Sequence, residues 1–219
     1  MNRLPAPVLR HLVALRAMLV FSVICGIAYP LLVTGVARAA FSKQANGSLI
    51  TNGKGQSVGS SLLCQEFVDA KGNPLPQYFQ PRPSDAVPSG AQNDYGCDPA
   101  QSAGSNLGPN SDRLVKLIKA NQQTMSAFDS VAGYSVAPDQ VAVDAVTASA
   151  SGLDPDISPL NAAQQEHRIA ATRGIPLAQV DALVKRYTGG RDLGFLGESG
   201  VNVLQLNIAL DTQYPYTGK

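Results

Sequence analysis

The dominant feature of the hydrophobic pattern is an uninterrupted apolar run from Ala17 to Ala37. At a rise of 1.5 Å per residue, a helix over this run reaches about 30 Å, the thickness of the hydrocarbon core of a bilayer. No other apolar run in the chain approaches this length. The pattern predicts a basic tail at 1–16, a transmembrane helix at 17–37 and a large polar domain at 41–219.

Within the polar domain the pattern predicts a mixed α+β fold. Alternating apolar residues predict strands at 48–50, 58–68 and 140–147, and residues 70–110 lack any periodic pattern. Apolar spacings of three and four residues predict helices instead in four places. These are a helix after Ser111 with a break near 120–123, helices at 159–173 (N-cap Ser158, stop Gly174) and 177–187, and a helix capped by Asn202 that runs to Leu210.

The charges around the apolar run predict its orientation. Three basic residues precede the run and two follow it: Arg3, Arg10, Arg16, Arg38 and Lys43. Because basic flanks favour the cytoplasmic side, we expect a cytoplasmic N-terminus and an extracytoplasmic domain, which in a bacterium is periplasmic. From Gln44 onward the chain has 12 basic and 16 acidic residues, a net charge of −4. This balance does not indicate a nucleic-acid partner.

A cleaved secretory signal is the alternative interpretation of the apolar run. Ala37-Arg38-Ala39 resembles a signal-peptidase site, and the preceding tail is basic. However, the run is longer than the roughly 7–15 apolar residues of a signal peptide, and Pro30 lies well inside it. The sequence therefore favours an uncleaved anchor.

One face of the predicted span carries small residues. Ser22 and Gly26 lie four residues apart, and Pro30 follows one turn later. Small residues at this spacing let another membrane helix approach closely, although they also occur in ordinary membrane helices. Pro30 predicts a kink near the carbonyl of Gly26, and Pro5 and Pro7 predict that regular helix begins only after them.

Three cysteines are divided between the span and the domain. Cys25 lies in the span, whereas Cys64 and Cys97 lie in the domain. If the domain is extracytoplasmic, oxidation is permitted and these two could form a disulfide. Two free thiols are the other interpretation, and the sequence does not decide between them.

The common catalytic signatures are absent from the sequence. It contains no P-loop, no GxGxxG motif, no GxSxG and no HExxH. With only His11 and His167, a metal site is not expected. A single membrane helix cannot enclose a pore, so a role in transport has to be shared with other subunits. The residues alone thus indicate an anchored, partner-binding domain.

Five polar residues are candidate contacts with a partner: Arg82, Ser149, Ser151, Asp154 and Asp156. Arg82 lies between two prolines, so it is rigidly presented and suits either pairing with a partner's carboxylate or exposure to solvent in a polyproline-type segment. The two aspartates, two residues apart in a proline-containing loop, suit either cation binding or the capping of turns, and the second is the more common role. The two serines have no histidine or lysine near them in sequence that would indicate a hydrolase.

Several motifs resemble the KdpC family, the C subunit of the Kdp potassium-transporting P-type ATPase. They occur in the family's order after a single N-terminal span, and the segment Ala150–Pro159 is the most specific of them. The motifs are YFQPRPS at 78–84, GSNLGP at 104–109, VTASASGLDPDISP at 146–159, LGFLG at 193–197 and VNVLQLNIALD at 201–211.

The resemblance implies a non-catalytic accessory subunit of a bacterial inner-membrane complex that uses ATP, Mg²⁺ and K⁺ but whose cofactors this chain does not bind. Its implied partners are a channel-like potassium-binding subunit, a P-type ATPase subunit and a small single-span subunit. The implied role is to hold the complex together and to cover the extracytoplasmic entrance of the channel-like subunit. The alternative role is that of a catalytic chaperone, which raises the ATP affinity of the ATPase subunit through nucleotide contacts at Ser102, Gly104, Ser105 and Asn106.

Overall fold

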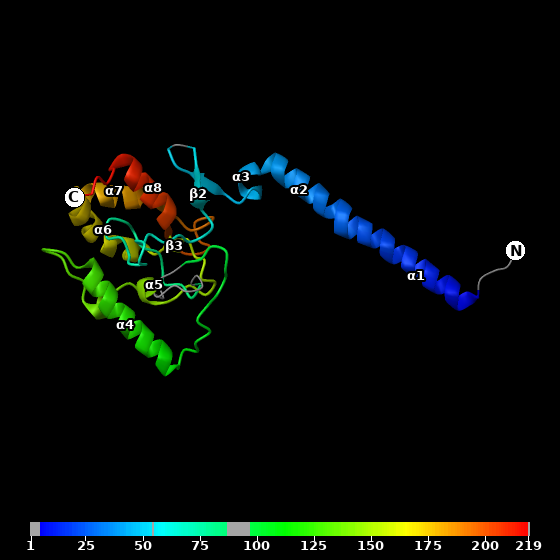
Figure 1. The fold of residues 1–219 in the computed structure, drawn as a ribbon, viewed down its shortest axis with the longest axis horizontal. Helices are drawn as coiled ribbons and strands as arrows, with labels where there is room; N and C mark the ends of the chain where they lie inside the picture. Colours follow the sequence, from blue (N-terminus) through cyan, green and yellow to red (C-terminus); the bar gives the residue numbers. More distant parts are fainter. Residues whose placement is uncertain (1–4, 54, 87–96, 219) are drawn as a thin grey trace. The chain divides into compact units, whose positions relative to one another are not determined.

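The computed structural model describes residues 5–53, 55–86 and 97–218. The chain divides into two compact units, Met1–Ser48 and Leu49–Lys219. The first unit is helical and the second combines helices with short strands, so the predicted α+β class is confirmed (Figure 1). Three parts of the chain lie outside the described residues: the first four residues of the tail, Lys54 between the first two predicted strands, and 87–96 within the segment that lacks a periodic pattern.

The first unit contains one long apolar helix, Ala6–Ala40, with the length and composition needed to cross a membrane. It is built from α1 (Ala6–Val23), a π-helical turn η1 (Ile24–Ala28) and α2 (Tyr29–Ala40), and the short α3 (Ser42–Ala45) follows. The helix extends beyond the apolar run at both ends. None of its residues is buried within the chain, although most of its side chains are apolar. An exposed apolar surface of this length is suited to the interior of a membrane and not to water.

The prolines of this helix act differently from the predictions. The expected start after Pro7 is wrong, because α1 begins at Ala6; Pro7 is tolerated in the first turn, where backbone donors have no helical partner. Near Gly26 the predicted irregularity is a π-helical turn, in which the N–H of Tyr29 bonds to the carbonyl of Ile24. A π turn before Pro30 accommodates the missing proline donor by widening the helix locally.

The second unit opens with a hairpin of β1 (Leu49–Thr51) and β2 (Ser57–Ser60). Its turn is closed by the Asn52 N–H donating to Gln56 O at 2.9 Å. The predicted strand at 58–68 is wrong beyond Ser60. Cys64 is buried there because it lies against the loop around Leu153, to whose carbonyl its N–H donates at 3.0 Å, and not because it belongs to a sheet.

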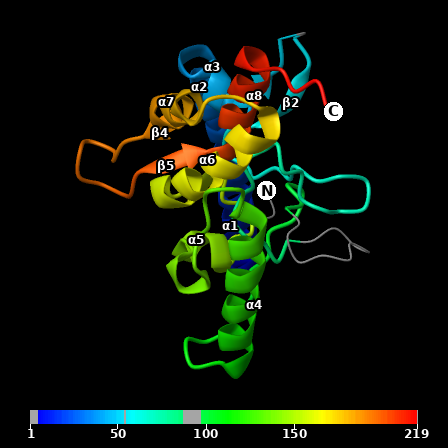
Figure 2. The same cartoon turned by 90° about the vertical axis from the view of Figure 1, so that its left-hand side faces the viewer.

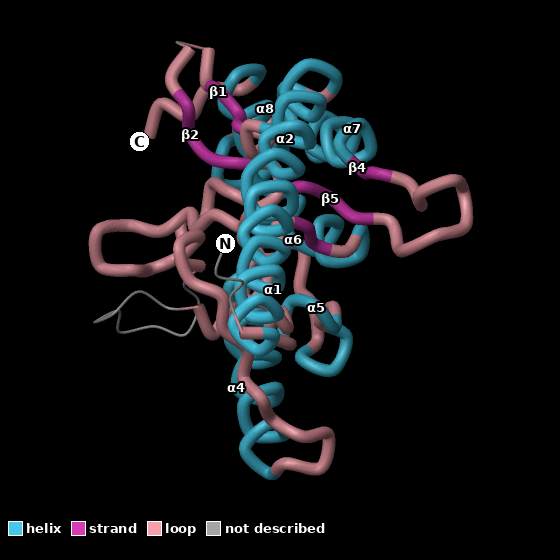
Figure 3. Tube along the Cα trace, turned by 90° about the vertical axis from the view of Figure 1, so that its right-hand side faces the viewer, coloured by secondary structure: helices cyan, strands magenta, loops and turns pink. Residues whose placement is uncertain are grey.

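A second, three-stranded sheet is made of very short strands. β3 (Asp156–Ile157) and β4 (Thr188–Gly189) both pair antiparallel with β5 (Gly200–Asn202), which lies between them (Figure 3). Strands of two or three residues have too few positions to show an alternating pattern, and the sequence did not predict them.

Five helices and a 3₁₀ turn complete the described part of this unit. They are α4 (Asp112–Asp129), η2 (Pro138–Gln140), α5 (Val143–Val146), α6 (Pro159–Arg173), α7 (Leu177–Tyr187) and α8 (Val203–Gln213). α4 is continuous, so the predicted break is wrong, and Ser111 stands at its N-cap position without a side-chain capping bond. The bounds of α6 and α7 are those predicted.

Local capping signals explain why α6 and α8 were predictable. Ser158 accepts a hydrogen bond from the N–H of Asn161, and Asn202 accepts one from Gln205, each at 3.1 Å. Gly174 ends α6 at φ +66°, a conformation that costs glycine little. These interactions involve residues three apart or fewer, so the sequence contains all the information that they need.

The strand predicted at 140–147 is wrong. η2 and α5 occupy this segment, and the buried residues Ala142, Ala145 and Val146 follow helical spacing. Val143, which the alternation places inside, is 74% exposed. The alternation of valines was fortuitous, because a single helical turn is too short to show its own period.

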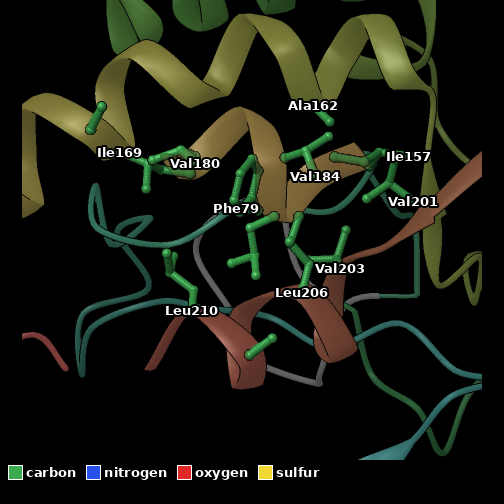
Figure 4. Close-up of a cluster of buried hydrophobic side chains, with 13 residues drawn as sticks. Phe79, Ile157, Ala162, Ile169, Val180, Val184, Val201, Val203, Leu206 and Leu210 are labelled. Carbon is green, nitrogen blue, oxygen red and sulfur yellow. The ribbon is translucent and has the colours of Figure 1, made fainter. Parts of the chain in front are cut away.

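The main core gathers one face from each of α6, α7 and α8 around Phe79 (Figure 4). Val180, Leu183 and Val184 come from α7, and Leu206 and Leu210 come from α8. Burying such side chains contributes about 1.5–3 kcal/mol each. A smaller cluster joins α4 to α5 and consists of Met125, Val136, Val141, Ala142, Ala145 and Val146.

Candidate partner-docking site

Four loop segments that are distant in sequence meet at one place in the domain. We call them the loop cluster and define it as residues 62–64, 82–86, 102–107 and 148–155. Backbone and side-chain hydrogen bonds of 2.8–3.0 Å hold the segments together. They are Ser149 N to Pro83 O, Ser84 Oγ to Gly152 O, Ala103 N to Ser151 O and Cys64 N to Leu153 O.

The segment that carries Arg82 is positioned by two amide side chains of the core. Asn207 of α8 accepts from the Phe79 N–H and donates to the Phe79 carbonyl, both at 2.9 Å. Gln165 of α6 accepts from the Gln80 N–H at 2.7 Å and donates to the Gln80 carbonyl at 3.1 Å. Each amide thereby satisfies both backbone groups of a buried residue that has no strand beside it. The position of Arg82 therefore follows from the packing of α6 and α8.

The loop cluster surrounds an open pocket of about 590 Å³. Four of the five polar residues predicted as partner contacts line this pocket, although Arg82 is far from the other three in sequence. The lining residues are Leu62, Leu63, Arg82, Ala148, Ser149, Ala150, Ser151, Leu153, Asp154 and Pro155. Asp156, the fifth predicted contact, is in β3, where its Oδ1 accepts a hydrogen bond from Asn202 at 3.1 Å. Burial raises the pKa of the Asp156 carboxyl group.

Arg82 is paired within the chain. Its Nη1 donates to Asp154 Oδ2 at 2.8 Å, and both side chains are half-buried at the pocket. Asp154 Oδ1 accepts from the N–H of Asp156 at 3.1 Å, so this aspartate also caps its own turn. Arg82 Nε is buried and has no hydrogen-bond partner among the described residues. The Arg82 guanidinium therefore lines the pocket with one donor unsatisfied in this conformation.

The two serines shape the loop that bears them. Their Oγ atoms lie 3.3 Å apart; Ser149 Oγ accepts from the Gly152 N–H at 3.2 Å and Ser151 Oγ from the Leu153 N–H at 3.1 Å. Gly152 has φ +72°, and a Cβ placed on it would lie 2.5 Å from the carbonyl oxygen of Ala103. Only glycine fits at this position, so the serine loop and the 102–107 segment can pack directly against each other.

The segment considered for nucleotide contact is used in this packing. Ser102 Oγ donates to Ser151 O at 2.9 Å, and a Cβ on Gly104 would lie 2.5 Å from the carbonyl of Ala150. Ser105 Oγ accepts from the Leu107 N–H at 3.4 Å, and Asn106 Nδ2 donates to Gly104 O at 2.9 Å. These hydrogen bonds give the four residues a structural role in the loop cluster.

A disulfide joins Cys64 to Cys97, with their Cα atoms 6.1 Å apart. Both residues are buried, and Glu66 Oε1 accepts a hydrogen bond from the Cys97 N–H at 2.6 Å. The bond attaches the first segment of the loop cluster to the chain that precedes the 102–107 segment. Cys25 is free and exposed on the apolar helix.

The sequence did not predict the role of Arg168, whose guanidinium makes four hydrogen bonds to described residues. It is buried on α6, where its Nε pairs with Asp129 Oδ1 at 2.8 Å and its guanidinium lies 4.3 Å from the centre of the Phe128 ring. It also donates to the carbonyls of Tyr78 and Pro76 and to the side chain of Gln165. Burial raises the pKa of Asp129, and the Arg168 charge opposes that rise. Partners up to 92 residues away leave no local signal in the sequence.

Glu166 is a second buried charged residue on α6. Burial and the nearby carboxylate of Asp181 on α7 raise the pKa of Glu166 to about 7, while Lys185 acts in the opposite direction. The neighbouring His167 stacks on the ring of Tyr134, with ring centres 3.5 Å apart. Among the residues that the structure describes, no group of three or more His, Cys, Asp or Glu is placed to hold a metal ion.

A single apolar helix of membrane length followed by one α+β domain is the architecture of a membrane-anchored domain. Comparisons with known proteins then show the family to which the chain belongs. Residues 11–212 match the family model KdpC, described as "K+-transporting ATPase, c chain". The chain is 46% identical over 202 residues to the potassium-transporting ATPase KdpC subunit of Caulobacter vibrioides, covering 92% of each chain.

Two further relatives carry the same name. Identity is 45% over 199 residues with the protein of Caulobacter sp. strain K31, covering 91% of each chain. It is 45% over 198 residues with that of Mycobacterium tuberculosis, covering 90% of this chain and 95% of the relative. The chain therefore belongs to the KdpC family, and the resemblance seen in the sequence motifs is confirmed.

Proposed function

We propose that this chain is an accessory, non-transporting subunit of a high-affinity, ATP-driven potassium import complex. In this role it stabilises the assembly and covers the extracytoplasmic entrance of a channel-like, potassium-binding subunit. Its other partners are a P-type ATPase subunit and a small single-span subunit. The observation that carries the proposal is the loop cluster, which brings four sequence-predicted partner contacts to one pocket.

The pocket has the composition of a protein-docking surface. Leu62, Leu63, Leu153 and Pro155 supply apolar area, and the Arg82–Asp154 pair supplies a polar edge. An apolar centre beside polar groups is the usual anatomy of an interface between proteins. Internal hydrogen bonds already fix the pocket walls, so little ordering cost remains for binding.

The disulfide supports an extracytoplasmic domain. Disulfides persist in oxidising compartments such as the bacterial periplasm, whereas cytosolic thiols are kept reduced. The bond between Cys64 and Cys97 agrees with the orientation that the basic tail predicts. A domain on this side can reach the entrance of an importing channel.

The apolar helix supports assembly within the membrane. Its small residues Ser22 and Gly26 lie on one face, and the π turn at Ile24–Ala28 includes Gly26. A smooth surface of this kind lets a second helix pack closely, and van der Waals packing is a principal force between helices in lipid. One helix encloses no pore, so the potassium pathway belongs to another subunit.

The test compares two leucines of nearly equal exposure in the full chain co-expressed with the other subunits. Leu62 (60% exposed) lines the pocket, whereas Leu160 (58% exposed), in the first turn of α6, does not. Leu62→Asp should reduce co-purification of the channel-like subunit about tenfold or more, because an apolar interface excludes a carboxylate. Leu160→Asp should leave it unchanged. Equal co-purification of the two variants would contradict a docking role for the pocket.

The alternative function is that of a catalytic chaperone whose 102–106 segment contacts ATP. The internal hydrogen bonds of Ser102 and Asn106 favour a structural role instead. A photoreactive ATP analogue added to the full chain in the complex distinguishes the two. Labelling of residues 102–106 that micromolar ATP abolishes would support the alternative, whereas labelling confined to the ATPase subunit supports docking.

A further inference from the structure

The loop between β4 and β5 carries an exposed apolar tip. Figure 2 shows this loop, residues 190–199, extending away from the helices of the domain. Leu193 is 83% exposed, Phe195 69% and Leu196 49%. We call residues 190–199 the apolar hairpin. None of its residues lines the pocket of the loop cluster, so it is a separate surface.

The apolar hairpin has an ordered backbone. The N–H groups of Asp192 and Leu196 each donate to the other's carbonyl at 2.9 Å, and the N–H of Gly194 donates to Arg191 O at 3.0 Å. An ion pair of 2.8 Å between Arg191 and Glu198 closes its base. The tip is therefore presented in one conformation, which lowers the entropy cost of binding.

The fold itself does not require apolar residues at this tip. Leu193, Gly194 and Gly197 all have positive φ, a conformation that favours glycine over leucine at position 193, and neither Leu193 nor Phe195 belongs to a core cluster. The β1–β2 hairpin shows the alternative, because its turn is built from Asn52, Gly53 and Gln56. Three large apolar side chains gathered on a projecting turn indicate a surface that another molecule covers.

The charges around the tip favour a protein over a lipid surface. Arg191, Asp192 and Glu198 give the hairpin a net charge of −1, and the Asp192 carboxylate has no ion pair among the described residues. Segments that insert into a membrane interface combine apolar side chains such as Trp, Phe and Leu with Lys or Arg, because anionic lipids attract positive charge. The hairpin has the apolar side chains but no Lys, its one arginine is already paired, and it lacks the Trp and Tyr that anchor segments at membrane interfaces.

A second copy of this chain complements the apolar hairpin less well than a partner with a basic pocket would. The open pocket of the loop cluster contains Arg82 neutralised by Asp154, so it offers no net positive charge to the acidic side of the hairpin. A partner with an apolar pocket bordered by Lys or Arg complements both the leucines and the unpaired Asp192. Such complementarity governs partner choice and the rate of association.

We propose that the apolar hairpin inserts into an apolar, basic-rimmed pocket on the extracytoplasmic side of another subunit of the same complex. This inference rests on the proposed function and deepens it by adding a second docking surface. Phe195 is the main anchor, because aromatic residues at the centre of an interface contribute most to binding. Asp192 pairs with a basic residue of the partner.

The test replaces Phe195 in the full chain and measures association with the other subunits. Phe195→Ser should weaken co-purification about tenfold or more. The control is Val143→Ser at another highly exposed apolar residue, and it should bind as the wild type does. Both variants should keep the wild-type melting temperature, because neither side chain packs in the core. Asp192→Lys should weaken association by a smaller factor that shrinks as salt is added.

A photocrosslinker identifies the occupant. With Phe195→p-benzoylphenylalanine, irradiation of the complex should yield a crosslink to another subunit at a site near Lys or Arg. Crosslinks only to lipid, or only to a second copy of this chain, would overturn the inference. So would a Phe195→Ser chain that co-purifies as well as the wild type, and that result would leave the proposed function standing. If the wild-type chain itself fails to co-purify, both fail.

Discussion

Two arginines of the domain, Arg168 and Arg82, form ion pairs of the same length in different surroundings. Arg168 is buried, pairs with Asp129 and is also bonded to two backbone carbonyls and a glutamine. Arg82 pairs with Asp154 at the edge of an open pocket, and its buried Nε has no partner among the described residues. The Arg168 side chain makes four hydrogen bonds within the chain, whereas the Arg82 side chain makes one to the described residues and lines an open pocket.

We expect the buried Arg168 pair to affect the stability of the fold and the Arg82 pair to affect binding to other subunits. A buried charge that loses its partner destabilises the fold, because nothing else solvates it. A half-buried pair beside solvent contributes little to folding, because water screens it. Changes around Arg168 should therefore lower the free energy of unfolding, and changes around Arg82 should mainly affect binding to other subunits.

Removing the buried arginine should have the largest effect. Arg168→Met leaves Asp129 buried without a partner, so we expect a loss of about 3–5 kcal/mol in the free energy of unfolding. Urea unfolding of the full chain in detergent measures it. Arg191→Met, at the exposed pair with Glu198, is the control and should cost less than about 1 kcal/mol. A double variant, Arg168→Met with Asp129→Leu, should recover much of the loss; no recovery would contradict the role of the unpaired charge.

Removing the disulfide of the loop cluster should have the second-largest effect on stability. Cys64 and Cys97 are separated by 33 positions, and closing a loop of this size stabilises a fold by about 3–4 kcal/mol in the chain-entropy model. Replacing both with alanine should lower stability by that order and also weaken co-purification, because the disulfide holds the segment whose Leu62 and Leu63 line the pocket. The matched control is Cys25→Ala. Unchanged stability without the disulfide would show that the packing of the loops alone is sufficient.

The buried carboxyl group of Glu166 should make the stability of the fold depend on pH. Its folded-state pKa is about 7, above the unfolded value of 4.5, so ionisation of this group disfavours the folded state as pH rises between these values. Glu166→Gln should stabilise the chain by up to about 3 kcal/mol at pH 8 and by little at pH 4.5. Unfolding at the two pH values, with the exposed Glu198→Gln as control, measures the difference. An equal gain at both would contradict a titrating Glu166.

Arg82 should give the smallest change in stability. Arg82→Ala removes a half-buried pair, which we expect to cost less than about 1 kcal/mol of unfolding free energy. The same variant should reduce co-purification with the channel-like subunit, because the pocket loses its donor. Lys185→Ala, at an exposed pair on α7, should leave co-purification unchanged. If Arg82→Ala destabilises the fold as strongly as Arg168→Met, the distinction between the two arginines fails.

Sequence reasoning succeeded where the determining interactions are local. Ser158, Gly174 and Asn202 act on backbone groups within one helical turn, so the bounds of α6 and the start of α8 were predictable. It failed at 140–147, where the valines alternate by chance and the segment contains a single helical turn instead of a strand. The strand expected at 58–68 is wrong beyond Ser60, because a disulfide and a distant loop bury Cys64 there and no sheet does.

The candidate site was predictable in part. The sequence analysis proposed Arg82, Ser149, Ser151 and Asp154 as partner contacts. The structure brings these four residues to one pocket, and their contact with a partner stays a prediction. Arg168 was missed, because a single arginine in an amphipathic helix resembles any solvated one. Besides Gln165 on the same helix, its partners come from two distant segments, 76–78 and Asp129, and only the tertiary structure brings them together.

The central claim is that this chain holds a potassium-transporting complex together. The most direct test is the size of the detergent-solubilised complex from cells that lack the chain, compared with cells in which the wild-type chain is restored. We predict that the channel-like and ATPase subunits elute separately without the chain, elute together when it is restored and remain separate with Leu62→Asp. Co-elution of the two subunits in the absence of the chain would contradict the claim.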